Sequence, residues 1–231
     1  MEPVSVAGFV VTCVRLSTLL YIWIMETKTV DGTVKAFAAE VEALSFVLDA
    51  VKSSSQDTRI INALPRQHNN ELWSFVQKTL CDCSTIVGEL DQLLAGIGSR
   101  SGVGHVITNF NLKLKSGKMT LLRQQIQSYT TVLQMSMQMI NVHLSVHNNA
   151  SNANSSAHLS SLSRSIKRAE SSLNRHSAEP MRASADGERE LADDHLAFGS
   201  LKQCTRMAHE VVSSASSVIG ETARSVRPGV H

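Results

Sequence analysis

Apolar residues recur at alternating steps of three and four along three long stretches of this chain, and this spacing is the strongest constraint on its fold. Residues spaced in this way form one stripe along an α-helix, as in the seam of a coiled coil. No stretch alternates apolar and polar residues between turn signals, as a half-buried strand would. The pattern therefore predicts an all-α chain. The seams consist of Val34, Phe37, Val41, Leu44, Leu48 and Val51, then of Trp73, Val76, Leu80, Cys83, Val87, Leu90, Leu94 and Ile97, and then of Met119, Leu122, Ile126, Tyr129 and Leu133.

The boundaries of these helices follow from their flanking residues. Asp31 and Asn70 are good N-cap residues, so they predict the starts of the first two helices. The third helix is predicted over about 116–146. Its seam continues through Met137, Ile140 and Leu144, but only after one extra residue, so the stripe changes direction within this helix.

A fourth apolar segment, residues 4–25, precedes the three seams. A stripe cannot bury itself, so the four segments predict an antiparallel four-helix bundle over residues 1–146. Residues 147–189 are predicted to form a Ser/Asn-rich basic linker, in which a seam over 156–175 favours a helix once a partner is present. Residues 190–223 are predicted to form a C-terminal amphipathic helix, and residues 224–231 a frayed tail.

The segment over residues 4–25 allows three interpretations. It is long enough to cross a bilayer, but Arg15 near its middle would cost about 2.5–3.5 kcal/mol in the hydrocarbon core. Glu2 and the lack of preceding basic residues argue against a secretory signal. A packed helix that becomes exposed under some condition is favoured over a constitutive anchor and over a signal peptide. The candidates for membrane contact or self-association are Gly8, Phe9, Val10, Leu16, Leu20 and Trp23.

The net charge of +2 hides a basic middle region. Residues 101–182 contain nine Lys or Arg against two Asp or Glu, whereas both flanking regions are weakly acidic. Such asymmetry is typical of contact with an anionic surface, although a solvated helix face gives the same pattern. The basic residues lack interleaved aromatics, so nucleic acid is not an expected partner. The candidates for an anionic surface are Lys113, Lys115, Lys118 and Arg123.

Motifs for chemistry are incomplete throughout the chain. Residues 116–118 resemble the end of a nucleotide-binding P-loop, but Leu112 stands where its first glycine is required. His143 and His147 share a helix face, yet two histidines are too few to hold zinc. No nucleophile elbow or paired-carboxylate motif occurs. We therefore expect no enzymatic activity, no cofactor, no metal and no small-molecule substrate.

The four cysteines are too few for a disulfide-stapled fold in 231 residues. They fit reduced residues within helices, which is typical of an intracellular protein. The sequence thus predicts a cytoplasmic location, with membrane association through residues 4–25 as an option.

Four stretches, taken together and in order, resemble the fungal N-terminal domain of STAND (NLR-like) proteins, also named after the azaphilone pigments biosynthesis cluster protein L. They are M-E-P-V-S-V-A-G-F-V at residues 1–10, E-V-E-A-L-S-F-V-L at 40–48, L-W-S-F-V-Q-K-T-L-C-D-C at 72–83, and L-K-S-G-K-M-T-L-L-R-Q-Q-I-Q-S-Y at 114–129. The stretch F-G-S-L-K-Q-C-T-R-M-A at 198–208 is similar to the region that follows this domain.

This resemblance implies a HeLo-like helical bundle that acts as a signalling module. It implies helix-mediated self-association or a protein partner, with membrane engagement by residues 4–25 in some members. No nucleotide-binding domain follows in this sequence, so the chain is expected to be a free-standing member or a shortened gene model. Two alternatives stay open: a constitutive single-pass membrane-anchored protein, and a structural bundle that pairs with a larger STAND partner.

Overall fold

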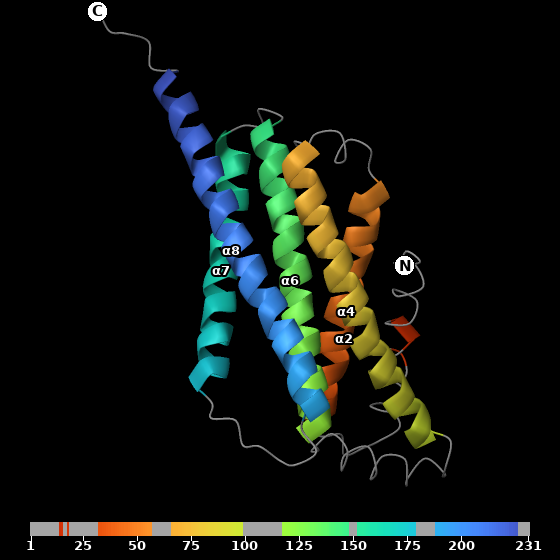
Figure 1. The fold of residues 1–231 in the computed structure, drawn as a ribbon. Helices are drawn as coiled ribbons and strands as arrows, with labels where there is room; N and C mark the ends of the chain where they lie inside the picture. Colours follow the sequence, from red (N-terminus) through yellow and green to blue (C-terminus); the bar gives the residue numbers. More distant parts are fainter. Residues whose placement is uncertain are drawn as a thin grey trace, which may run out of the picture.

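The computed structural model describes five long helices, and no strand occurs among the residues it describes, so the prediction of a helical chain is confirmed for them. The described residues are 32–56, 66–98, 117–147, 152–178 and 188–225, together with Val14, Arg15 and Thr18. The helices are α2 (Gly32–Gln56), α4 (Arg66–Gly98), α6 (Gly117–His147), α7 (Asn152–Ala178) and α8 (Glu188–Ser225). Each helix runs opposite to the preceding one, with their long axes side by side (Figure 1).

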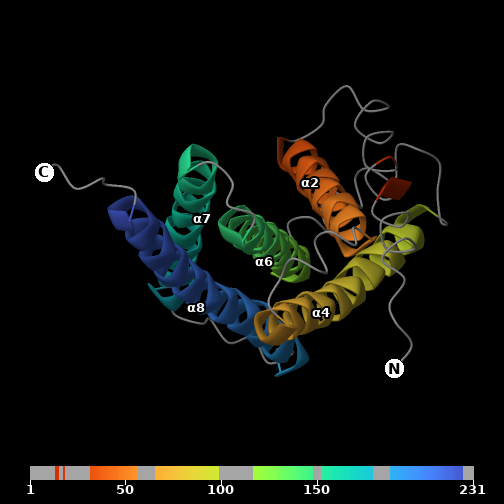
Figure 2. The same ribbon diagram turned by 90° about the horizontal axis from the view of Figure 1, so that it is seen from above.

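Helix α6 is the central element of the fold. It packs against each of the other four helices, which surround it when the molecule is viewed along its long axis (Figure 2). Helices α2 and α4 cover one side of α6, and α7 and α8 cover the other. Two hydrophobic clusters result, and α6 contributes side chains to both.

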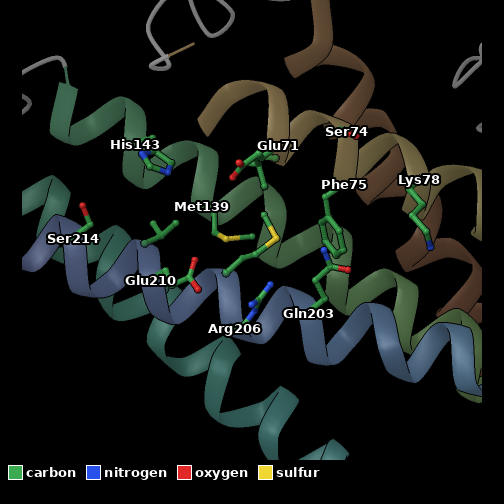
Figure 3. Close-up of a pocket in the computed structure, with 13 residues that line it drawn as sticks. Glu71, Ser74, Phe75, Lys78, Met139, His143, Gln203, Arg206, Glu210 and Ser214 are labelled. Carbon is green, nitrogen blue, oxygen red and sulfur yellow. The ribbon is translucent and has the colours of Figure 1, made fainter. Parts of the chain in front are cut away.

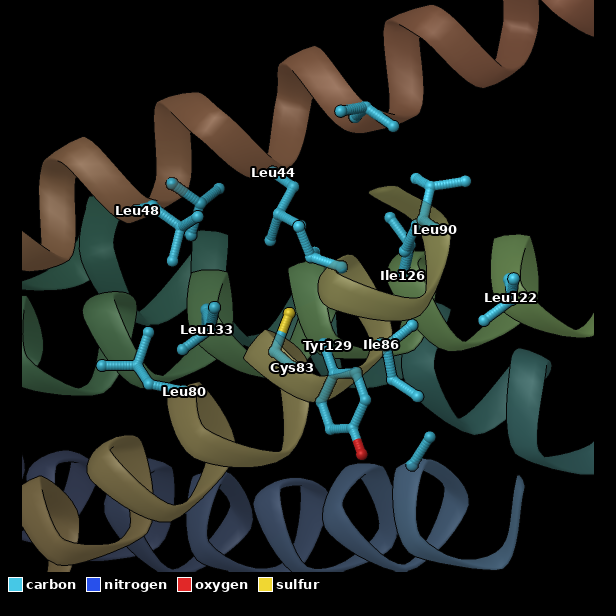
Figure 4. Close-up of a cluster of buried hydrophobic side chains, with 14 of the residues drawn as sticks. Leu44, Leu48, Leu80, Cys83, Ile86, Leu90, Leu122, Ile126, Tyr129 and Leu133 are labelled. Carbon is cyan, nitrogen blue, oxygen red and sulfur yellow. The ribbon is translucent and has the colours of Figure 1, made fainter. Parts of the chain in front are cut away.

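The first cluster lies between α2, α4 and α6 (Figure 4). On α6 it uses the stripe predicted from the sequence, in which Ile126, Tyr129 and Leu133 are at most 1% exposed. The seams of α2 and α4 meet this stripe, so three helices bury their apolar faces together. The buried residues from these two helices are Phe37, Ala38, Val41, Leu44, Val47, Leu48 and Val51 on α2 and Val76, Leu80, Cys83, Ile86, Val87 and Leu90 on α4.

The second cluster lies between α6, α7 and α8, with Leu72 and Phe75 of α4 at its margin. Here α6 uses a second stripe, formed by Val132, Met135, Met139, Ile140 and Val142, all of them buried. The sequence predicts that the first stripe continues through Met137, Ile140 and Leu144. In the structure only Ile140 of these three is buried, because α6 turns a different face to α7 and α8 than to α2 and α4.

Burial on two sides leaves α6 very little solvent contact. Over residues 120–146 its exposed positions are Thr120, Gln127, Gln134 and Asn141, one in every seven residues. All four are neutral and polar, and residues 124–146 contain no Asp, Glu, Lys or Arg. At the other positions of this stretch, which are half-buried or buried, a charge would be partly desolvated, so neutral side chains suit a helix that is enclosed by four others.

Helix α7 occupies most of the stretch that the sequence analysis treated as a polar linker with a helix over 156–175. It packs Leu162, Ile166 and Ala169 against α6 and α8, and each of these is at most 3% exposed. All but one of the serines of α7 with described side chains are exposed or half-buried; Ser155 is buried. A polar helix with one narrow apolar stripe is therefore stabilised by tertiary packing, which outweighs its composition.

Residues 1–31 are described only at three positions. Val14, Arg15 and Thr18 are helical, and the Arg15 guanidinium donates a hydrogen bond to the Asp91 carboxylate of α4. An antiparallel four-helix bundle over residues 1–146 needs residues 4–25 as its fourth helix. Most of these residues lie outside the described part of the chain, so the bundle stays a prediction. None of the described helices is long and apolar enough to span a bilayer.

Candidate interaction surfaces

An open groove of about 510 Å³ runs between α4 and α8, with α6 as its floor (Figure 3). It forms because α4 and α8 lie on either side of α6 and diverge from each other along this part of the molecule (Figure 1). Apolar side chains line its depth, namely Leu72 and Phe75 of α4, Met139 of α6, and Met207 and Val211 of α8. Leu72, Phe75 and Met139 are already buried in the core, so Met207 and Val211 are the apolar lining residues that remain partly exposed in the groove.

Charged residues on the two walls of this groove follow the same order. From the end marked by His143 toward the end marked by Lys78, the α4 wall carries Glu71 and then Lys78 (Figure 3). In the same direction, the α8 wall carries Glu210 and then Arg206. Helices α4 and α8 run in opposite directions, so residue numbers rise along one wall and fall along the other. Glu71 therefore comes before Lys78, and Glu210 before Arg206, in the same direction along the groove. On each wall an acidic residue precedes a basic one, and the two pairs are offset, because Arg206 lies across the groove from Glu71 (Figure 3).

The basic residues of the groove are accessible. The side chain of Lys78 is 60% exposed and donates a hydrogen bond to Asp82, one turn further along α4, at 2.9 Å. Arg206 and Glu210 are both exposed on α8. Exposed charges of this kind add little stability to the monomer, since solvent screens them. They remain able to pair with charges on another molecule.

Most of the residues predicted as sites lie outside the described residues. This applies to Gly8, Phe9, Val10, Leu16, Leu20 and Trp23, and to Lys113 and Lys115. Lys118 lies in the first turn of α6, where the structure describes the backbone alone. Arg123 is the one member of the predicted anionic-surface set whose side chain the structure describes.

Arg123 lies against α2 and forms an ion pair with Glu40. Its Nε and Nη2 atoms donate to the two Glu40 carboxylate oxygens at 3.0 and 2.6 Å. Gln127 donates a third hydrogen bond to the same carboxylate at 2.8 Å. The guanidinium carbon also lies 5.8 Å from the centre of the Phe37 ring, within the range of a cation–π contact. The hydrogen bonds that Arg123 donates to Glu40 raise the pKa of Arg123, so this side chain is charged at any physiological pH. In the structure, Arg123 joins α6 to α2 through this ion pair.

The cysteines and histidines in the described residues form no group of three that could hold a metal. Cys83 and Cys204 are buried cysteines and Cys81 is an exposed one. Burial raises the pKa of the Cys204 thiol to about 12, although its contact with Ser136 acts in the opposite direction. The Cys204 Sγ also lies 3.6 Å from the carbonyl oxygen of Val132 on α6. This thiol is protonated and inert at neutral pH.

Comparison of the chain with protein-family models, with curated proteins and with solved structures finds no match. The resemblance to the fungal STAND N-terminal domain therefore stays a prediction.

The apolar seams do not predict the groove. Its α4 wall depends on Leu72 and Phe75, which lie beside the predicted seam of that helix rather than within it. Two apolar residues three positions apart and next to a seam indicate a wider apolar face, and this signal was available in the sequence. The wall that α8 forms cannot be predicted from a seam, because a groove arises only where α8 lies at some distance from α4.

Proposed function

We propose that this protein is a non-enzymatic interaction module that self-associates through the groove between α4 and α8. The observation that carries the proposal is the order of charge along that groove, acidic to basic on both walls, above an apolar floor. A second copy of the chain is the occupant that fits this order best.

The fit follows from symmetry. Most homodimers have a two-fold axis, which places the same surface patch on both subunits in opposite orientations. A two-fold axis that crosses the groove at right angles reverses the order of charge in the second copy, so the acidic residue of each wall would lie toward the basic residue of the same wall on the partner. Glu71 of one subunit would then face Lys78 of its partner, and Glu210 would face Arg206. Complementary charge gives specificity and orientation, while the burial of the partly exposed Met207 and Val211 supplies affinity.

Residues 4–25 belong to the same proposal. We place them as the fourth helix of a bundle with α2, α4 and α6, supported by the contact between Arg15 and Asp91. Their apolar sequence supports membrane engagement after a triggering event, in the manner that the resemblance to fungal STAND proteins implies. Fractionation of cells that contain the full chain or its Leu20→Asp variant tests this part. Equal distribution of the two proteins under every condition of stimulation would remove membrane engagement from the proposal.

Charge-swapped variants test self-association directly. In the Lys78→Glu/Arg206→Glu variant the groove carries acidic residues alone, and in the Glu71→Lys/Glu210→Lys variant it carries basic residues alone. Like charges would then face each other in a homodimer, so we expect each variant to sediment as a monomer at concentrations where the wild-type chain is a dimer. An equimolar mixture of the two variants restores opposite charges across the interface, so it should sediment as a heterodimer. Analytical ultracentrifugation at low ionic strength measures all three samples.

The matched control changes the same charges elsewhere. Lys35 and Lys202 are exposed residues of α2 and α8 that do not line the groove. The Lys35→Glu/Lys202→Glu variant has the net charge of the acidic groove variant, and we expect it to dimerise like the wild-type chain. A wild-type chain that stays monomeric up to about 100 μM, well above the Kd of a specific complex, would refute the proposal. So would a mixture in which the two groove variants remain separate.

A further inference from the structure

A second cleft lies on the other side of α6, between α2 and α7. Its volume is about 420 Å³, and α6 forms its floor through a row of neutral polar side chains. It differs from the groove between α4 and α8 in composition, because most of its lining is polar. The lining residues are Glu40 and Ala43 on α2, Gln124, Gln127, Ser128, Thr130 and Thr131 on α6, Arg168, Ala169, Ser172 and Arg175 on α7, and Leu201 on α8.

The charge of this cleft is positive once its internal ion pair is considered. Glu40 is its one lining carboxylate, and that carboxylate already accepts two hydrogen bonds from Arg123 and one from Gln127. The negative charge of Glu40 is thereby balanced by Arg123. The guanidinium groups of Arg168 and Arg175 remain, and neither forms an ion pair among the described residues.

These two arginines have a defined spacing. They are seven residues apart on α7, so they lie on the same face, separated by two turns or about 10 Å along the helix axis. Arg175 directs its Nε to the carbonyl oxygen of Ser171 at 3.3 Å, which leaves the two Nη groups of that guanidinium for a ligand. Two guanidinium groups at this spacing can each contact one end of an extended anion.

Neutral donors complete the cleft. The side chains of Gln124, Ser128 and Ser172 line it and make no hydrogen bond within the described part of the chain. An amide and two hydroxyl groups can donate to anionic oxygens that lie between the two arginines. The hydroxyl groups of Thr130 and Thr131 instead donate to backbone carbonyl oxygens of α6, at 2.7 and 2.9 Å.

We propose that the cleft between α2 and α7 binds a molecule with two or more linked phosphate groups, as a ligand and not as a substrate. Guanidinium groups bind phosphate oxygens through paired, charge-assisted hydrogen bonds, which favours phosphate over a single carboxylate. A chain of linked phosphates spans the distance between Arg168 and Arg175 and brings its middle oxygens to the neutral donors. The same chemistry is found in soluble polyphosphorylated molecules and in lipid headgroups that carry two or more phosphates.

Isothermal titration calorimetry with tripolyphosphate tests the cleft on the full chain at low ionic strength. We expect the wild-type protein to bind, and the Arg168→Gln/Arg175→Gln variant to bind at least tenfold more weakly. The control is Arg164→Gln/Lys167→Gln, which removes two positive charges from the same helix outside the cleft. Arg164 is a close match, because its Nε also donates to a carbonyl oxygen one turn earlier at 3.3 Å. The control variant should bind within twofold of the wild-type chain.

Two results would overturn the proposal: no heat of binding from the wild-type protein at millimolar tripolyphosphate, or an equal loss of affinity in both double variants. Circular dichroism at 222 nm checks that all three proteins are equally helical. Co-sedimentation with phosphatidylcholine vesicles that contain cardiolipin, whose headgroup has two phosphates joined through glycerol, then separates the two sources of phosphate. Sedimentation that tripolyphosphate competes away assigns the cleft to a lipid headgroup, and binding of tripolyphosphate without sedimentation assigns it to a soluble molecule.

Discussion

The ion pair between Arg123 and Glu40 is expected to hold α2 against α6, and a double-mutant cycle measures how strongly. The cycle compares Arg123→Met, Glu40→Gln and the double variant with the wild-type chain. Methionine keeps much of the length of the arginine stem, and glutamine keeps the shape of the carboxylate. The changes therefore remove charge and hydrogen bonding with little loss of packing volume, which is the condition for a cycle to report on the pair itself.

The expected coupling energy follows from the geometry and exposure of the pair. Two hydrogen bonds, at 3.0 and 2.6 Å, join groups that are only 23% and 17% exposed. Hydrogen bonds that involve a charged group contribute about 1.5–3 kcal/mol, whereas exposed ion pairs contribute only about 0.2–1 kcal/mol. This pair is partly desolvated, which offsets some of the gain. We expect a coupling energy of about 2 kcal/mol, between these limits.

Urea denaturation followed by circular dichroism gives the free energy of unfolding for each of the four proteins. The same cycle on Lys78 and Asp82 is the control, because these residues form an exposed pair at positions i and i+4 of one helix. The control should show a coupling energy of about 0.3–0.5 kcal/mol, which 0.5 M salt abolishes. The Arg123–Glu40 coupling should largely persist in salt. A coupling below about 0.5 kcal/mol for Arg123 and Glu40, or an equal sensitivity of both pairs to salt, would refute the reasoning.

Two further predictions concern buried polar groups. Cys204 has a folded-state pKa of about 12 against an ordinary value of 9.0, so its contribution to stability is complete below pH 9. Above that pH the unfolded thiol ionises first, and the free energy of unfolding should fall by up to about 1.4 kcal/mol per pH unit; a Cys204→Ala variant with an equally steep loss between pH 9 and 10.5 would contradict this. Gln125 is 1% exposed, and its Nε2 has no hydrogen-bond acceptor among the described residues. Gln125→Met should leave the urea midpoint unchanged or raise it, because an unpaired buried donor costs about 1–3 kcal/mol; a lower midpoint would show that this amide has a partner elsewhere in the chain.

The helices were predictable because their signal is local. A seam such as that of α2, from Val34 to Val51, needs only the 3.6-residue period of the helix and one apolar face. The same helical period predicts the stripe of α6 through Ile126 and Leu133. It also indicated a helix within α7, where the step of Leu162, Ile166 and Ala169 conflicted with a serine-rich composition.

The arrangement of the helices was less predictable, because it depends on what packs against each face. Helix α6 has a second stripe through Val132, Met135 and Met139, and a single seam cannot describe a helix that is buried on two sides. The groove and the cleft on either side of α6 depend on the distances between the outer helices. Those distances are set by the sizes of all the side chains between them, and no periodicity within one helix contains that information.

The central position of α6 also bears on how the chain is made. Helices α2 and α4 leave the ribosome first, and their apolar seams stay uncovered until α6 follows. Gln56 ends α2 and His147 ends α6, which is 91 residues later (147 minus 56). At roughly 5–20 residues per second, the seam of α2 is exposed on the nascent chain for roughly 5–20 s. During that interval the seam presents Phe37, Leu44 and Leu48 to any chaperone or neighbouring chain.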